Sequence, residues 1–144
     1  MHSGYTQRVL AGLREQGLRI TPQRIAILNY LDGNTGHPTA DEIYRAVSRE
    51  HPTLSLATVY NTLDTLERFE AVQAVTVKHN CKHYDPDTHP HHHAICRQCH
   101  RIHDVFADLA AAVRVPPGLE ETFLVEHAVV HLRGLCRACS SAIS

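Results

Sequence analysis

The clearest indication of the fold comes from residues 55–85, which read SLATVYNTLDTLERFEAVQAVTVKHNCKHYD. Ser55 is a typical N-cap residue, because its hydroxyl can accept a hydrogen bond from the first turn of a helix. Apolar residues then recur at the spacing of one helical face: Val59, Leu63 and Leu66. This stretch therefore predicts a helix over residues 56–69.

The periodicity changes after this helix. Residues 71–77 are rich in β-branched side chains and alternate in character, which predicts a strand. A turn at residues 79–82 and a return strand at 83–85 complete a predicted β-hairpin.

Three further helices are predicted upstream of residue 55. The first covers residues 5–16 and stops at Gly17, and the second begins with Thr21 as cap and Pro22 at the first helical position. The third begins at Thr39-Ala40-Asp41-Glu42, which has the pattern of a capping box. Helices followed by a β-hairpin form a winged helix-turn-helix.

In a helix-turn-helix the second helix enters the DNA major groove with its N-terminal residues. Here that helix is residues 56–69, and Thr58, Tyr60, Asn61 and Thr62 are expected on its outer face. The DNA-binding candidates are Arg24, Ser55, Thr58, Tyr60 and Asn61. An ordinary amphipathic helix with a polar outer face explains the same pattern equally well.

The composition limits the class of protein. The chain has 144 residues, 43% of them hydrophobic and 20% charged, which allows one domain or two small ones. Its formal net charge of −1 gives no general sign of a nucleic-acid binder, so any basic surface must be local. There is no apolar run long enough for a membrane span and no apolar signal segment near Met1, so we expect a cytoplasmic protein.

Four of the five cysteines form two C-x-x-C pairs, Cys96/Cys99 and Cys136/Cys139. Two such pairs in sequence predict a closed Cys₄ zinc site of structural type, with one Zn²⁺ per subunit. A redox role would need a thioredoxin-like βαβ context, which surrounds neither pair. The fifth cysteine, Cys81, is interpreted as a partly buried small side chain.

Eight of the thirteen histidines lie between residues 79 and 103. On a strand, His91 and His93 point to the same side, and Asp85 and Asp104 are close enough in sequence to reach the same ion. Imidazoles combined with carboxylates suit Fe²⁺ or Mn²⁺ better than a zinc-only site. His37 lies far upstream, and its spacing does not show whether it joins. His92 is a candidate for a secondary site, with His89 or His131.

The second half of the chain is predicted to be a small α/β unit. We expect a strand at residues 91–95, a helix at 105–115 capped by Asp104, and a strand at 123–132 that ends at the second cysteine pair. The expected domains are residues 1–84, for DNA binding, and 85–144, for metal binding and dimerisation. The fold class is therefore α+β.

Two other classes of function use residues of these types. A metal-dependent hydrolase needs an open coordination position and a general base in a pocket, and no motif for these is visible. A histidine-rich metal buffer does not need an ordered set of capped helices. Neither class explains both halves of the chain.

Together these residues resemble the ferric uptake regulator family of metal-dependent repressors. The matching stretches are TPQR at 21–24, HPTADEIY at 37–44, ATVYNTL at 57–63, HHHAICRQC at 91–99 and LCRAC at 135–139. The resemblance covers nearly the whole chain. It implies a homodimer that binds double-stranded operator DNA when loaded with metal, with no catalytic activity, no membrane and no small-molecule substrate. It also implies that His37 is a ligand.

The resemblance is strongest to the peroxide-responsive, PerR-like branch, because of His83-Tyr84-Asp85 and of Asp104. That branch implies one regulatory Fe²⁺ or Mn²⁺ per subunit, held by His37, Asp85, His91, His93 and Asp104. It also implies that peroxide oxidises His37 or His91 and relieves repression. An iron- or manganese-uptake regulator without peroxide sensing is the alternative. One departure is that the family usually has Gly just after the recognition helix, where this chain has Phe69-Glu70-Ala71.

Overall fold

The protein has an α+β fold in two compact units. The structure is a computed structural model that describes residues 4–78 and 80–142, and the chain divides after Thr88. Asp85 therefore belongs to the N-terminal unit, together with His37. Within the described residues, none of the helices has the length and apolar character needed to cross a lipid bilayer.

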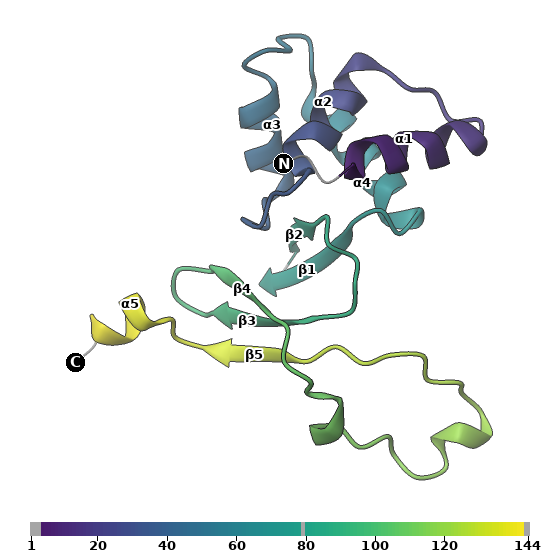
Figure 1. Ribbon diagram of the computed structural model, residues 1–144. Helices are drawn as coiled ribbons and strands as arrows, with labels where there is room; N and C mark the ends of the chain where they lie inside the picture. Colours follow the sequence, from purple (N-terminus) through teal and green to yellow (C-terminus); the bar gives the residue numbers. More distant parts are fainter. Residues whose placement is uncertain (1–3, 79, 143–144) are drawn as a thin grey trace. The chain divides into compact units, whose positions relative to one another are not determined.

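Helices make up most of the N-terminal unit (Figure 1). They are α1 (Tyr5–Glu15), α2 (Pro22–Leu31), α3 (Ala40–Val47) and α4 (Leu56–Arg68). The side chains of Thr21, Thr39 and Ser55 each accept a hydrogen bond from a backbone N–H of the first turn, and Thr39 and Glu42 form a complete capping box. The predicted helix starts are thus confirmed.

The helices surround one apolar core. Ile27, Leu28, Ile43, Val59 and Leu63 are completely buried in it. The three positions that predicted the inner face of α4 all lie in this core. Thr62, predicted on the outer face, is buried instead, and its hydroxyl donates a hydrogen bond to the carbonyl of Thr58 at 2.8 Å. A threonine can be buried on a helix in this way because the carbonyl one turn earlier satisfies its hydroxyl.

A two-stranded antiparallel sheet follows the helices. It consists of β1 (Gln73–Lys78) and β2 (Cys81–Asp85), with an irregularity between Thr76 and Lys78. The return strand starts two residues earlier than predicted, and His79 of the predicted turn lies outside the described residues. The order of helices and hairpin confirms the winged helix.

The end of α4 has an unusual residue in a common motif. The N–H of Glu70 donates to the carbonyl of Glu67 at 3.1 Å. The N–H of Ala71 donates to the carbonyl of Leu66 at 2.8 Å. This is a Schellman motif, in which Gly normally takes the left-handed position. Glu70 takes that position here, with φ of 54°. The helix therefore ends in the expected way even though the Gly is missing.

The C-terminal unit is built on a three-stranded sheet. Its strands are β3 (His92–Cys96), β4 (Ile102–Val105) and β5 (His131–Gly134), in the order β4-β3-β5. β4 is antiparallel to β3, and β5 is parallel to it. Two short 3₁₀ helices, η1 (Ala110–Ala112) and η2 (Leu119–Glu121), lie between β4 and β5, and α5 (Arg137–Ser141) follows β5 (Figure 1).

Two predicted elements of the second half are wrong. The helix at 105–115 is absent, because Asp104 and Val105 belong to β4 and only a 3₁₀ turn follows. The strand at 123–132 is reduced to a strand that begins at His131. Several large apolar side chains of these segments are exposed, among them Phe106, Phe123 and Leu124 at 70%, 61% and 83%. A short helix or strand gains little stability when its apolar face packs against nothing.

The left-handed residue at the end of α4 gives a testable prediction. Glu70→Gly should raise the free energy of unfolding of the N-terminal unit by roughly 1 kcal/mol, because Gly adopts positive φ without the steric cost of a Cβ. Glu50→Gly is the matched control, since Glu50 is also exposed and does not have positive φ. Urea unfolding of both variants measures the difference. Equal destabilisation by the two changes would contradict the assignment.

Candidate metal centres

The four cysteines of the C-x-x-C pairs gather at one point of the C-terminal unit. The Sγ atoms of Cys96, Cys99, Cys136 and Cys139 all lie within 4.8 Å of one another. The Cys99 and Cys136 sulfurs are 3.8 Å apart. Tetrahedral zinc with Zn–S bonds of about 2.3 Å places its sulfurs about 3.8 Å apart. The cluster thus has the size and donor type of a structural zinc site, while Cys81, on β2, belongs to the N-terminal unit.

Local backbone structure positions both pairs. Cys96 ends β3, and the following turn closes with a hydrogen bond from the His100 N–H to the Cys96 carbonyl at 2.9 Å. Cys136 is the N-cap of α5 and places Cys139 in the first turn of that helix. The Arg97 N–H donates to the Gly134 carbonyl at 2.8 Å and holds the two pairs side by side.

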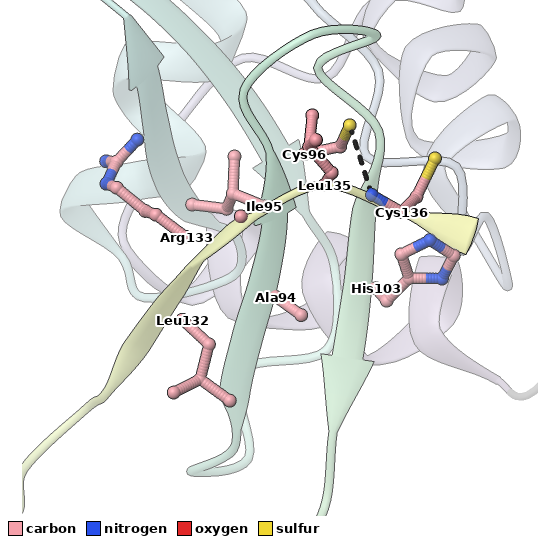
Figure 2. Close-up of a pocket in the computed structure, with 9 residues that line it drawn as sticks. Ala94, Ile95, Cys96, His103, Leu132, Arg133, Leu135 and Cys136 are labelled. Carbon is pink, nitrogen blue, oxygen red and sulfur yellow. Dashed lines mark hydrogen bonds between the residues drawn. The ribbon is translucent and has the colours of Figure 1, made fainter. Parts of the chain in front are cut away.

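Hydrogen bonds stabilise the thiolate form of one cysteine in this cluster. The backbone N–H of Cys136 donates to the Cys96 sulfur at 3.4 Å, as Figure 2 shows. This bond, with a second from the Cys99 backbone, lowers the pKa of Cys96 to about 5. The hydrogen bond with Cys136 raises the pKa of Cys139 to about 12. Thiolates are the form that binds zinc, so metal binding must displace the remaining thiol protons.

A small hollow of about 200 Å³ adjoins the cysteines. Ala94, His103 and Leu132 line one side of it, together with Cys96 and Cys136 (Figure 2). Ala94 pairs with both His103 and Leu132, so these three residues share one face of the sheet. His93 and Asp104 lie on the opposite face.

The N-terminal unit holds one buried histidine–carboxylate pair, His37 and Asp85. Their exposed fractions are both 2%, and Nε2 of His37 lies 3.3 Å from Oδ2 of Asp85. His37 has φ of 50°, an uncommon conformation for a residue other than Gly. We call this pair the N-terminal half-site.

Backbone bonds bring this pair together across 48 residues of sequence. The Tyr84 N–H donates to the Pro38 carbonyl at 2.9 Å, and Thr39 forms an isolated β-bridge with His83. The ring of His83 donates from Nδ1 to the His37 carbonyl at 2.8 Å. The Asp87 N–H donates to Asp85 Oδ1 at 2.9 Å, which fixes the carboxylate. Such outer hydrogen bonds are typical of residues that orient metal ligands.

The C-terminal unit holds a second group, His91, His93 and Asp104, which we call the C-terminal half-site. His93 and Asp104 are paired across β3 and β4, and His91 directly precedes β3. Oδ1 of Asp104 lies 2.9 Å from Nε2 of His91 and 3.6 Å from Nε2 of His93. Both histidines are buried, with exposed fractions of 2% and 1%.

The contact between His91 and Asp104 requires a cation between the two facing atoms. Nδ1 of His91 lies 2.7 Å from the His89 carbonyl, which can only accept, so Nδ1 carries the proton. In the neutral ring, Nε2 then presents a lone pair to a carboxylate oxygen. Two acceptors at this distance are held together by a proton or a metal ion between them. Imidazole and carboxylate donors fit Fe²⁺ or Mn²⁺.

His131 lies beside this half-site, whereas His92 does not. The rings of His93 and His131 are edge to face, with centroids 5.5 Å apart. Desolvation of the ring, followed by the charges of His93 and Arg133, lowers the pKa of His131. His92 points to the other face and accepts a hydrogen bond from the Val130 N–H. The suggested pairing of His92 with His131 is therefore wrong.

The candidate DNA-binding residues lie on or near α4, with Arg24 on α2. Tyr60 and Asn61 are exposed on the first turns of α4, as predicted. The hydroxyls of Ser55 and Thr58 are 2.9 Å apart at the start of the helix. Arg24 donates to the Arg19 carbonyl at 2.6 Å, so it also supports the loop between α1 and α2.

Comparison with known proteins agrees with this geometry. The model of the ferric uptake regulator family matches residues 15–132. The peroxide-responsive repressor PerR of Staphylococcus aureus (strain Mu50) is 40% identical over 131 residues, which cover 90% of this chain and 88% of that protein.

Solved structures give the same relationship. The peroxide stress regulator of Campylobacter jejuni is 33% identical, with a TM-score of 0.67, and the match covers 90% of this chain and 98% of that one. The ferric uptake regulator of Helicobacter pylori is 17% identical, with a TM-score of 0.75 over 97% of this chain and 94% of that one. The second likeness concerns the fold alone.

The cysteine cluster gives a testable prediction. Cys96→Ser should abolish zinc retention, because it removes one of four ligands and the most acidic thiol. The C-terminal unit should then lose its ordered amide signals in NMR spectra, while zinc content is measured by mass spectrometry. Cys81→Ser is the control and should keep its zinc. Full zinc occupancy in the Cys96 variant would refute the Cys₄ assignment.

Proposed function

The chain belongs to the ferric uptake regulator family of metal-dependent transcriptional regulators, which are not enzymes, and we propose that it is a dimeric repressor controlled by Fe²⁺ or Mn²⁺. The metal-loaded dimer binds operator DNA and blocks transcription. The observation that carries this proposal is the 2.9 Å contact between His91 and Asp104, which places a ring lone pair against a carboxylate. Because the proposed target is operator DNA, we expect the protein in the cytoplasm.

In this proposal one ion takes ligands from both half-sites. His37 and Asp85 come from the N-terminal unit, and His91, His93 and Asp104 come from the C-terminal unit. Three imidazoles and two carboxylates make a five-ligand set that suits Fe²⁺ or Mn²⁺. An ion that binds the closed arrangement of the units more tightly shifts the population toward that arrangement. The zinc site keeps the C-terminal ligands in place throughout.

The DNA surface in this proposal is the exposed start of α4. Asn61 offers an amide that can pair with adenine, and Tyr60 offers a ring and a hydroxyl for bases or phosphate. Ser55, Thr58 and Arg24 lie near the helix start and are assigned to the DNA backbone. In a dimer, the two copies of this helix contact the two halves of an inverted DNA repeat.

We further propose that peroxide relieves repression. Support comes from the 40% identity to proteins named peroxide-responsive repressors. Fe²⁺ held by these residues would pass one electron to peroxide, and the oxidised ion would take one electron back from the ring, so that in sum a ring C–H and H₂O₂ give the oxygenated ring and water. His37 and His91 hold their rings at the site through Nε2, so either ring can take up the oxygen and lose its affinity for metal. Mn²⁺ does not supply this chemistry, so the manganese form stays a repressor.

Metal-dependent DNA binding is the first test. The Mn²⁺-loaded protein should select an inverted-repeat operator from random-sequence DNA and retard it in a gel, and a chelator should abolish the shift. Asn61→Ala should weaken this binding by about 10-fold or more, which corresponds to one lost base contact. Asn29→Ala is the matched control, because Asn29 is an exposed amide on α2. Operator binding that ignores metal would overturn the proposal.

Peroxide sensitivity is the second test. After peroxide treatment, peptides containing His37 or His91 should gain one oxygen atom in the Fe²⁺-loaded protein and none in the Mn²⁺-loaded protein. Mass spectrometry of the digested protein measures the gain. An Fe²⁺-loaded protein that gains no oxygen at either histidine would favour an iron- or manganese-uptake regulator without peroxide sensing.

A further inference from the structure

His131 lies next to the C-terminal half-site on a third strand. It is the register partner of His93 across the parallel strands β3 and β5. Register partners in neighbouring strands project to the same face of a sheet. The ring contact with His93, at 5.5 Å between centroids, agrees with that placement.

His91, His93, His131 and Asp104 are four potential donors that follow one another by direct contact within one unit. The ring centroids of His91 and His93 are 4.6 Å apart, so the ring of His93 contacts those of both His91 and His131. Asp104 contacts both His91 and His93 from β4. Three imidazoles and one carboxylate, with water in the remaining positions, are a reasonable ligand set for Mn²⁺ or Fe²⁺. All four residues belong to the C-terminal unit.

We propose that His131 is a further metal ligand, which allows the C-terminal unit to hold the regulatory ion without the N-terminal half-site. This inference rests on the proposed function, because it shares His91, His93 and Asp104 with the regulatory site. It adds an order of events: the ion binds to the C-terminal unit first, and His37 and Asp85 join it afterwards.

Exposure favours His131 as the first contact. His131 is exposed, whereas His91 and His93 are buried. A hydrated ion arriving from solvent therefore meets His131 before it meets the buried rings. The charge of Arg133, two residues further along β5, opposes the approach of a cation. The carboxylate of Asp104 compensates for that charge.

The experiment uses the full chain with zinc in the cysteine site. His37→Ala combined with Asp85→Ala removes both N-terminal ligands, and Mn²⁺ binding to this variant is measured by the loss of the free Mn²⁺ signal in electron paramagnetic resonance. We expect one Mn²⁺ per chain, bound more weakly than in the unaltered protein. Adding His131→Gln should lower this remaining affinity by about 10- to 100-fold.

The control is His127→Gln in the same background, because His127 is another exposed histidine of the segment that leads into β5. It should leave Mn²⁺ binding unchanged. Zinc content and circular dichroism confirm that each variant is folded. The inference is overturned if the double variant binds no Mn²⁺, or if His131→Gln changes its affinity no more than His127→Gln does.

A second measurement is independent of the His131 substitution. Mn²⁺ bound to the double variant should broaden the ring-proton NMR signals of His91, His93 and His131 to a similar extent. A His131 signal that stays sharp while the other two broaden would also overturn the inference. Neither result tests whether operator binding needs metal. The proposed function can therefore be right when the inference about His131 is wrong, and the gel-shift experiment tests it independently.

Discussion

The contact on which the regulatory account depends is that between a ring nitrogen and a carboxylate. His91 is fixed through Nδ1 by the His89 carbonyl, and its other nitrogen faces Asp104 at 2.9 Å. Nε2 of His37 faces Oδ2 of Asp85 at 3.3 Å. Both contacts are buried or nearly so, where a carboxylate needs a cationic partner. The fold has thus placed donors for a cation in each of its two units.

The rest of the structure holds these donors in place. In the N-terminal unit, the bridge between Thr39 and His83 brings a loop histidine to the end of β2. In the C-terminal unit, the sheet sets His93 beside both Asp104 and His131, and the cysteine cluster joins the end of β3 to the segment after β5. Zinc therefore acts as a clamp on the sheet that carries the regulatory ligands.

Local signals in the sequence were sufficient to locate the helices of the N-terminal unit. Thr21, Thr39 and Ser55 cap helices through contacts within four residues, and such contacts can be recognised from the sequence. The partnership of His37 with Asp85 could not be recognised in this way, because it depends on strand pairing between distant segments, and only family resemblance indicated it. His131 was one of two options for a site with His92, and its true neighbour, His93, could not be recognised because it depends on the register of β5. The helix predicted at 105–115 is absent because several of its apolar side chains, Phe106 among them, stay largely exposed and would gain little from packing.

The central claim is that the same ion serves both half-sites and so couples metal binding to DNA binding. Such a coupling must be reciprocal: the factor by which Mn²⁺ tightens operator binding equals the factor by which operator tightens Mn²⁺ binding. The most direct measurement is therefore the Mn²⁺ affinity of the zinc-loaded protein with and without saturating operator DNA. The account predicts a clear increase with operator that His37→Ala removes. An Mn²⁺ affinity that operator leaves unchanged would contradict it.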